Sequence, residues 1–191
     1  MKKAFLLASI LLISVITTAC INNFAVQELN NKAKAFMDSG DYASAIERLK
    51  SSVDLDSTVF ETQYNLAVAY TKAEDYENAI KTYDEASKIN PDFSDIYYSR
   101  AVCEENLAKD IISGLLVVDD EGKIEKAESA DQEDETKKEL SDSAKNIIVS
   151  YLSSASEDYQ IYMDKAQNAS ENAEINNKLE ELSKLSEKYA K

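Results

Sequence analysis

The chain has 191 residues, of which 44% are hydrophobic, and its formal net charge at pH 7 is −15. It contains only 3 Gly and 1 Pro, so few tight turns and a mostly helical protein are expected. It has no His, which excludes Ser-His and Cys-His nucleophiles and His-ligated metal sites, and it has no glycine-rich phosphate loop. The acidic charge repels nucleic acid and favours a basic partner, or serves solubility alone. We therefore expect a protein that is not an enzyme and that holds no metal or cofactor.

Residues 1–20 have the layout of a secretory signal peptide. Lys2 and Lys3 supply positive charge, residues 5–16 (FLLASILLISVI) form an apolar run, and small residues precede Cys20. The apolar run is short for a transmembrane helix, which needs about 20 apolar residues. The end of this stretch, TTAC, resembles the signal of bacterial lipoproteins, although that family usually has Leu, Val or Ile where Thr17 stands.

The resemblance to bacterial lipoproteins implies cleavage before Cys20, a diacylglyceryl group on its thiol and an N-acyl chain on the new N-terminus. Two or more acyl chains together hold a protein stably at a bilayer. Residues 1–19 are then the signal peptide and residues 20–25 a lipidated spacer, with the protein at the cell envelope. It would be anchored to the outer or the cytoplasmic membrane and would face the periplasm or the exterior. An ordinary signal peptide with an incidental Cys20, and an uncleaved anchor, are the alternatives.

Two adjacent segments, residues 38–58 and 72–92, align without gaps. Asp41 and Tyr42 match Asp75 and Tyr76 at a constant offset. This offset equals the period of the tetratricopeptide repeat, a pair of antiparallel helices that spans about 34 residues. The second repeat unit, which includes residues before the second segment, resembles this family closely, with Leu66, Ala67, Tyr70, Ala79, Tyr83, Ala86 and Pro91 at its characteristic positions. The resemblance implies an all-α fold with two clear repeats. A generic amphipathic helical bundle is the alternative.

A third repeat begins near Phe93, with Tyr97 at the large aromatic position and Ala101 at the small one. Cys103 then falls at a small inward position, which indicates a buried structural thiol. The pattern fails afterwards, so the third repeat is partial. Residues 110–118 (DIISGLLVV) are either a shortened helix or one arm of a β-hairpin, since periodicity cannot decide so short a run. Repeats are expected over residues 26–118.

Residues 119–138 are strongly acidic and indicate a linker or insertion. Helical periodicity returns over residues 139–191, where Ala144, Ile148, Ala155 and Tyr159 lie on one stripe. This segment is one long helix or two antiparallel helices. Since repeat arrays expose an apolar end, we expect it to form a C-terminal cap, with a projecting arm for a partner helix as the alternative.

Tetratricopeptide repeats bind extended or helical peptides on a concave face built from the first helix of each repeat. The resemblance places in this groove Asn30, Lys34, Tyr64, Asn65, Val68, Lys72, Tyr98, Val102 and Glu105. Asn65 occupies a position that contacts peptide backbone in chaperone-binding members, but Asp95 and Ser99 stand where those members have Lys and Arg. A ligand with a C-terminal carboxylate is therefore not favoured. The groove tyrosines equally suit packing against the C-terminal helix.

The combination predicts a membrane-anchored, non-catalytic adaptor that binds a protein or peptide partner at the bacterial cell envelope. A structural component of an envelope assembly machine, for outer-membrane protein, pilus or secretion biogenesis, is the second hypothesis. A solute-binding envelope protein, with a pocket between the repeats and the cap, is the third.

Overall fold

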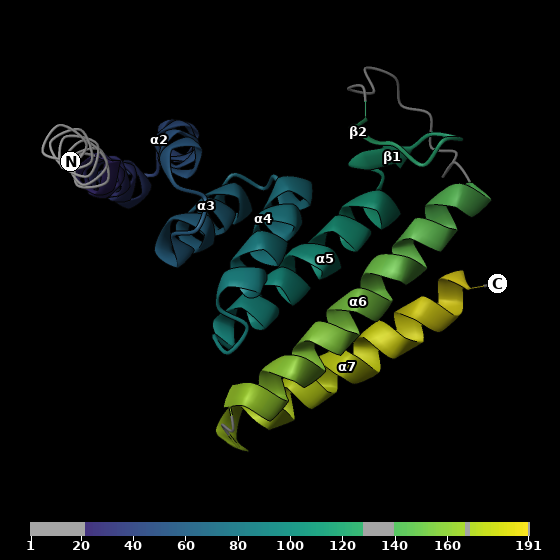
Figure 1. Cartoon of the computed structure of the whole chain (residues 1–191). Coiled ribbons are helices and arrows are strands. Elements are labelled where there is room, and N and C mark those ends of the chain that lie inside the picture. The colour runs from purple at the N-terminus through teal and green to yellow at the C-terminus, as the bar shows by residue number, and fades with distance from the viewer. Residues whose placement is uncertain (1–21, 128–139, 167–168, 191) are drawn as a thin grey trace, which may run out of the picture. The chain divides into compact units, whose positions relative to one another are not determined.

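The computed structural model describes residues 22–127, 140–166 and 169–190. Most of these residues are helical (Figure 1), and the expected all-α class with repeated helical hairpins is confirmed. The chain divides into two compact units, Met1–Asp75 and Tyr76–Lys191. The first helix of the second predicted repeat lies in unit 1 and its second helix in unit 2.

Unit 1 consists of a helix over residues 22–38, α2 (Tyr42–Leu55) and α3 (Phe60–Lys72). The described part of this helix therefore includes residues 22–25, which were expected to be part of a spacer. The core contains the buried residues Ala33, Ala45, Leu49, Leu66 and Ala69, with Phe36, Met37, Ile46, Val53 and Tyr70 packed around them. Three of the buried residues are alanines, whose small side chains let the helices approach closely, and the larger residues fill the space beside them.

The turns at the ends of the first helices show the repeat in the backbone. Gly40 follows the first helix with a φ of 78°, and Glu74, which stands one repeat period later, has a φ of 58° after α3. Glycine adopts this left-handed region without steric cost, whereas a residue with a Cβ does not. Asp41 then caps α2, because its carboxylate accepts a hydrogen bond from the Ser44 backbone N–H at 3.1 Å.

Unit 2 begins with α4 (Tyr76–Ile89) and α5 (Asp95–Ser113), which pack against each other. The Tyr97 hydroxyl donates a hydrogen bond to the Pro91 carbonyl at 2.9 Å, which fixes the connection between the two helices. Cys103 on α5 is buried, as expected for a structural thiol. At 19 residues, α5 is longer than the 13-residue α3, and it ends at Gly114, whose φ is 82°.

A β-hairpin follows α5. Of the two alternatives for residues 110–118, the helix holds for the part up to Ser113 and the arm of a β-hairpin holds for Leu116–Val118. β1 (Leu116–Val118) pairs antiparallel with β2 (Ile124–Lys126), with Val117 opposite Glu125. The Asp119 carboxylate holds the turn by accepting hydrogen bonds from the backbone N–H groups of Glu121 and Lys123, at 2.9 and 2.8 Å. β2 lies within the segment predicted as an acidic linker, most of which lies outside the described residues.

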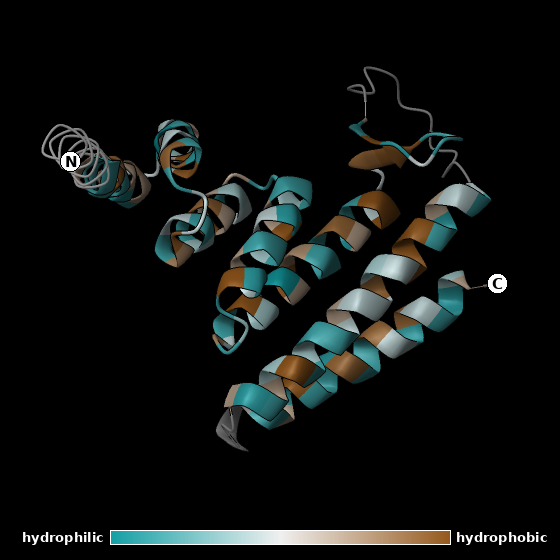
Figure 2. Ribbon diagram, viewed as in Figure 1, coloured by the Kyte–Doolittle hydropathy of each residue, from teal (hydrophilic) through white to brown (hydrophobic). Residues whose placement is uncertain are grey.

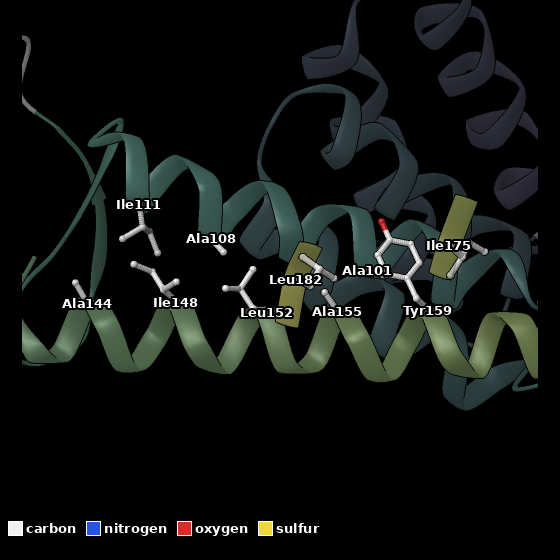
Figure 3. Close-up of a cluster of buried hydrophobic side chains, with 10 residues drawn as sticks. All are labelled: Ala101, Ala108, Ile111, Ala144, Ile148, Leu152, Ala155, Tyr159, Ile175 and Leu182. Carbon is white, nitrogen blue, oxygen red and sulfur yellow. The ribbon is translucent and has the colours of Figure 1, made fainter. Parts of the chain in front are cut away.

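The C-terminal segment is a helix pair, α6 (Asp142–Ala166) and α7 (Ala169–Tyr189). α6 runs antiparallel to α5 and packs against both α5 and α7 (Figure 1). Figure 3 shows side chains from one side of α6 directed at α5, with α7 contributing two more. The buried members of this cluster are Ala101, Ala108, Ile111, Ala144, Ile148, Leu152, Ala155, Tyr159, Ile175 and Leu182.

α6 takes the place expected for the second helix of the third repeat. Ala155 and Tyr159 repeat the spacing of Ala79 and Tyr83 in α4, and Ala155 lies close to Ala101 of α5 (Figure 3). The third helical hairpin is therefore complete, but residues 114–141 are inserted between its two helices. Figure 2 shows hydrophobic and hydrophilic residues interspersed along α6 and α7, as amphipathic packing requires.

Candidate functional site

Six of the nine predicted groove residues lie in unit 1. Asn30 and Lys34 are one turn apart on the helix over residues 22–38, and Tyr64, Asn65, Val68 and Lys72 lie on successive turns of α3. A hydrogen bond between the side chains of Asn30 and Thr62, at 2.8 Å, holds the two helices side by side. The six residues therefore occupy neighbouring helices of one unit.

The polar contacts of Asn30 are made within the protein. Its side chain exchanges hydrogen bonds with the Thr62 hydroxyl, at 2.8 and 3.2 Å, and the Ser52 hydroxyl lies 3.4 Å from that of Thr62. Thr62 and Ser52 are fully buried. Since a buried hydroxyl without a partner is costly, this network ties α2, α3 and the first helix together, and it gives Asn30 a structural role.

The other five predicted groove residues of unit 1 retain accessible surface. Tyr64, Asn65 and Val68 are half-buried, and Lys34 and Lys72 are exposed. The Tyr64 ring stacks on Phe60, with centroids 5.9 Å apart. No carboxylate of the described residues lies within 4.0 Å of the ammonium group of Lys34 or Lys72. We call Lys34, Tyr64, Asn65, Val68 and Lys72 the unit 1 face.

The three predicted groove residues of unit 2 pack against the C-terminal helices. The Tyr98 ring contacts Tyr159 and Tyr162 of α6, with centroids 5.7 and 5.2 Å apart. Val102 packs on the same cluster, and Glu105 is only 6% exposed. Of the two alternatives for the tyrosines, packing against the C-terminal segment therefore holds for Tyr98. These positions of α5 do not form an open strip.

Glu105 is held by donors from three helices. Oε1 accepts from Lys109 at 2.5 Å, and Oε2 accepts from the Tyr159 hydroxyl at 2.9 Å and from Lys178 of α7 at 3.3 Å. Burial alone would raise the pKa of Glu105, but the hydrogen bonds from Lys109 and Tyr159 and the charges of both lysines outweigh it and lower the pKa. Burial and the charge of Glu105 raise the pKa of Tyr159. Glu105 is thus an ionised group that joins α7 to α5.

A second buried charge cluster lies where α4, α5 and α6 meet. Arg100 of α5 donates two parallel hydrogen bonds to Asp158 of α6, at 2.5 and 2.6 Å, and a third to Asp84 of α4. The side chain of Asp158 is 4% exposed and that of Arg100 is 16% exposed. Burial alone would lower the pKa of Arg100, but the hydrogen bonds and charge of Asp158 raise it, so the guanidinium stays charged.

Glu104 lies one turn beyond Arg100 and is 5% exposed. Its Oε2 is buried and has no hydrogen-bond partner in the part of the chain that the structure describes. Burial, and then the charge of Asp158, raise the pKa of Glu104 to about 8. Glu104 therefore carries a proton at neutral pH, unlike its neighbour Glu105.

Sequence reasoning missed Arg100 and Glu104, although the repeat period marks them. One period earlier in the chain, Leu66 corresponds to Arg100 and Tyr70 to Glu104. Two positions that are apolar or aromatic in the second repeat are thus charged in the third. A charged residue at a repeat position that faces the core is the signal that could have found this cluster.

Open cavities border α6, α7 and the hairpin in the described residues. One of about 380 Å³ lies between α5 and α7 and is lined by Glu105, Lys109, Glu181, Leu182, Lys184, Leu185 and Lys188. Another, of about 300 Å³, lies under the β-hairpin beside Ile111 and Leu140. Neither cavity is lined by Arg100, Glu104 or Asp158. Glu104, the carboxylate with the strongly raised pKa, therefore lies outside both of these cavities.

Cys20, the predicted lipidation site, lies outside the described residues. Among the helices of residues 22–127, 140–166 and 169–190, none has the length and hydropathy needed to cross a bilayer. Within the same residues, His, Cys, Asp and Glu side chains form no cluster of three or more suited to a metal ion.

Comparison with known proteins supports the repeat family. Residues 36–103 match the sequence model of the tetratricopeptide repeat. No curated protein matches the sequence. Among solved structures, the second tetratricopeptide domain of human RPAP3, in complex with the HSP70 peptide SGPTIEEVD, is 16% identical with a TM-score of 0.56, covering 85% of this chain and 98% of that chain.

Two further structures have the same fold. The first tetratricopeptide domain of Spaghetti (RPAP3), bound to the HSP90 peptide SRMEEVD, is 18% identical with a TM-score of 0.55, covering 84% of this chain and 91% of that chain. The tetratricopeptide domain of Sgt2 from Aspergillus fumigatus is 15% identical with a TM-score of 0.54, covering 85% and 79%. At these identities the likeness establishes the fold alone.

Proposed function

We propose that this chain, in which a tetratricopeptide segment follows a lipoprotein-like signal, is a membrane-anchored, non-catalytic adaptor of the bacterial cell envelope. The unit 1 face would bind an extended segment of a protein partner. The single observation that carries this proposal is a difference in surroundings between the predicted groove residues of unit 1 and those of unit 2. The unit 1 face is accessible, whereas Tyr98, Val102 and Glu105 contact the C-terminal helices.

The chemistry of the unit 1 face suits a peptide. Tyr64 offers a large contact area at low cost in side-chain entropy, and its hydroxyl suits a polar partner. The Asn65 amide carries a donor and an acceptor, which match the backbone of an extended segment. Lys34 and Lys72 add positive charge to a chain whose net charge is −15, so acidic side chains on the partner would be complementary locally. Two solved proteins of the same fold hold peptides, which supports a peptide as the class of ligand.

The anchor would come from Cys20. A lipid on this residue would place the helix over residues 22–38 directly beside the bilayer, because only Ile21 intervenes. The described helices offer no spanning segment, and the short apolar run of residues 5–16 precedes Cys20. The adaptor would therefore hold its partner close to the membrane surface.

Site-specific photocrosslinking tests the binding face. A photoreactive lysine analogue is placed at Lys34, at Lys72, or at Lys50, an exposed lysine of α2 that serves as the matched control. In intact cells, Lys34 and Lys72 should crosslink to the same partner, and Lys50 should not. The partner segment is then titrated as a purified peptide, where Tyr64→Ala and Val68→Asp should weaken binding at least about tenfold, or about 1.4 kcal/mol. Unchanged affinity in both variants, with the fold intact by circular dichroism, would rule out this face.

A further inference from the structure

Glu104 occupies an uncommon position for a carboxylate. It lies on α5 at the junction with α4 and α6, is 5% exposed, and has a buried Oε2 without a hydrogen-bond partner among the described residues. Buried polar atoms in native proteins are nearly always hydrogen-bonded, and each exception needs a physical explanation. A neutral carboxyl tolerates such a site far better than an ionised carboxylate does.

The groups around Glu104 are mainly acidic. Those that act on its charge are Asp84 of α4, Asp158 and Glu157 of α6, and Arg100 of its own helix. Tyr151 of α6, whose pKa is raised by burial and by the charges of Glu77 and Glu104, is the other titratable neighbour. The cluster thus has several carboxylates and one cation.

Arg100, the cation among these described groups, is already engaged. The Arg100 guanidinium donates to Asp158 through two nitrogen atoms, at 2.5 and 2.6 Å, and to Asp84 through the third. An ionised Glu104 would be an additional negative charge that this guanidinium does not pair with. Burial and the charges of Asp158, Asp84 and Glu157 disfavour its ionised form more than the charge of Arg100 favours it.

We infer that Glu104 is a proton-binding site that couples the packing of α4, α5 and α6 to pH. With the proton bound, the neutral carboxyl is compatible with the closed junction. When the proton leaves, the carboxylate draws water and loosens α6 from α5, which uncovers Tyr98 and the buried cluster below it. The inference concerns unit 2 alone and does not depend on the proposed peptide binding.

The sign of the pH effect follows from linkage. The pKa of Glu104 is about 8 in the folded chain and 4.5 in its unperturbed state. The stabilisation is fully present below about pH 4.5 and is lost as the pH rises through about 8. Within this window the ratio of folded to unfolded unit 2 falls by up to about tenfold for each pH unit.

The test compares the full-length chain with Glu104→Gln, which mimics the protonated carboxyl, and with Glu157→Gln, which removes an exposed carboxylate of the same cluster. Hydrogen exchange of α5 and α6 is followed from pH 6 to 9.5 and corrected for the intrinsic pH dependence of exchange. Near-ultraviolet circular dichroism is recorded in parallel, since the chain has 11 Tyr and no Trp. In the parent chain, protection of α6 should fall as the pH rises toward 8 and level off above it, and the tyrosine signal should change with a midpoint near pH 8. In Glu157→Gln both changes should move slightly to lower pH, because the charge of Glu157 raises the pKa of Glu104, and in Glu104→Gln neither change should occur.

A direct titration keeps the inference testable if Glu104→Gln does not fold. The ¹³C resonance of the Glu104 carboxyl, assigned in the parent chain, should move with a midpoint near pH 8, compared with 4.5 for an unperturbed Glu. A midpoint near 4.5 would overturn the inference. So would a Glu104→Gln chain that loosens with the same midpoint as the parent.

Discussion

Glu104 and Glu105 are adjacent on α5, are both buried, and have pKa values shifted in opposite directions. Glu105 accepts hydrogen bonds from Lys109, Tyr159 and Lys178, so its charged form is favoured. Glu104 has a buried oxygen without a partner among the described residues and faces Asp158 and Asp84, so its neutral form is favoured. Neighbouring residues of a helix point about 100° apart, which places one carboxyl at the junction with α4 and the other toward α7.

Glu105→Gln should destabilise unit 2 by about 1–3 kcal/mol at pH 7, because two lysines and a buried tyrosine lose a charged acceptor. The folded pKa of Glu105 lies below its ordinary value of 4.5, so this stabilisation is present above about pH 4.5 and is lost as the pH falls through the folded pKa. Urea unfolding at pH 7 and at pH 3 measures both effects. Glu181→Gln, on an exposed residue of α7, is the control and should change stability by less than about 0.5 kcal/mol. A pH-independent difference between the parent and Glu105→Gln would contradict the assignment of an ionised Glu105.

Arg100→Leu introduces the residue that the second repeat has at the same position, yet it should destabilise the protein by about 3–5 kcal/mol. The reason is that Asp158, with 4% of its side chain exposed, would be left without its two donors. Thermal unfolding checks the loss. Adding Asp158→Leu to the same chain should recover most of it, since an apolar pair often replaces a buried ion pair without loss. If the double variant is as unstable as the single one, the unpaired Asp158 is not the cause.

Lys88→Ala is the matched control for Arg100→Leu. Lys88 pairs with Glu85 at 2.6 Å on α4, but both side chains are more than half exposed. Exposed pairs of this kind contribute little or nothing measurable to stability. If Lys88→Ala lost as much stability as Arg100→Leu, burial would not explain why the two ion pairs contribute differently to stability.

Glu74→Gly should raise stability by up to about 1 kcal/mol, because Glu74 has a φ of 58° at a turn where the first repeat has Gly40 with a φ of 78°. Gly40→Ala should lower stability by about 1 kcal/mol, since it introduces a Cβ at a left-handed position that is otherwise open space. Chemical denaturation of both variants gives the comparison. Effects of the same sign in the two variants would refute the backbone explanation.

Cys20→Ala should prevent lipid attachment and release the processed protein from the membrane fraction. Metabolic labelling with a fatty acid and cell fractionation measure the two effects. Cys103→Ala, which changes the buried thiol of α5, should leave labelling and membrane association unchanged. Lipid labelling that persists in the Cys20→Ala chain would show that the anchor is elsewhere.

The helical hairpins could be predicted because their spacing is local. The matches of Tyr42 with Tyr76 and of Ala45 with Ala79 establish the repeat register, and the small and large positions of each hairpin follow from it. The sequence could not decide between one long helix and a helix pair at the C-terminus. The periodicity of residues 139–191 shows which residues share a helix face, but it does not show how many helices there are.

The second helix of the third repeat could not be found by advancing one repeat period along the chain from α4. Its Ala155 and Tyr159 have the required spacing, but residues 114–141 displace them along the chain. The surroundings of Tyr98 could not be predicted for a related reason. Whether Tyr98 is open or covered depends on where α6 returns, and that is a tertiary contact that the sequence of α5 does not contain.

The positions of the buried charged residues could be predicted from the sequence, but their partners could not. Arg100 and Glu104 differ visibly from Leu66 and Tyr70 at the corresponding repeat positions. Their partners come from α4 and α6, and charge pairing across three helices leaves no periodic pattern. The opposite behaviour of Glu104 and Glu105 is set by those partners, so it becomes evident only when the helices are assembled.

The insertion of residues 114–141 also bears on the order in which the protein folds. The helix over residues 22–38 and α2 are joined by a short turn, so their hairpin can close as soon as both segments have been synthesised. α5 must wait for α6, and the entropic cost of closing the longer loop slows that step. During this interval Ala101, Ala108 and Ile111 remain exposed on α5. The third hairpin should therefore be the last to form, and the interval before it closes is when a newly made chain is most exposed to aggregation.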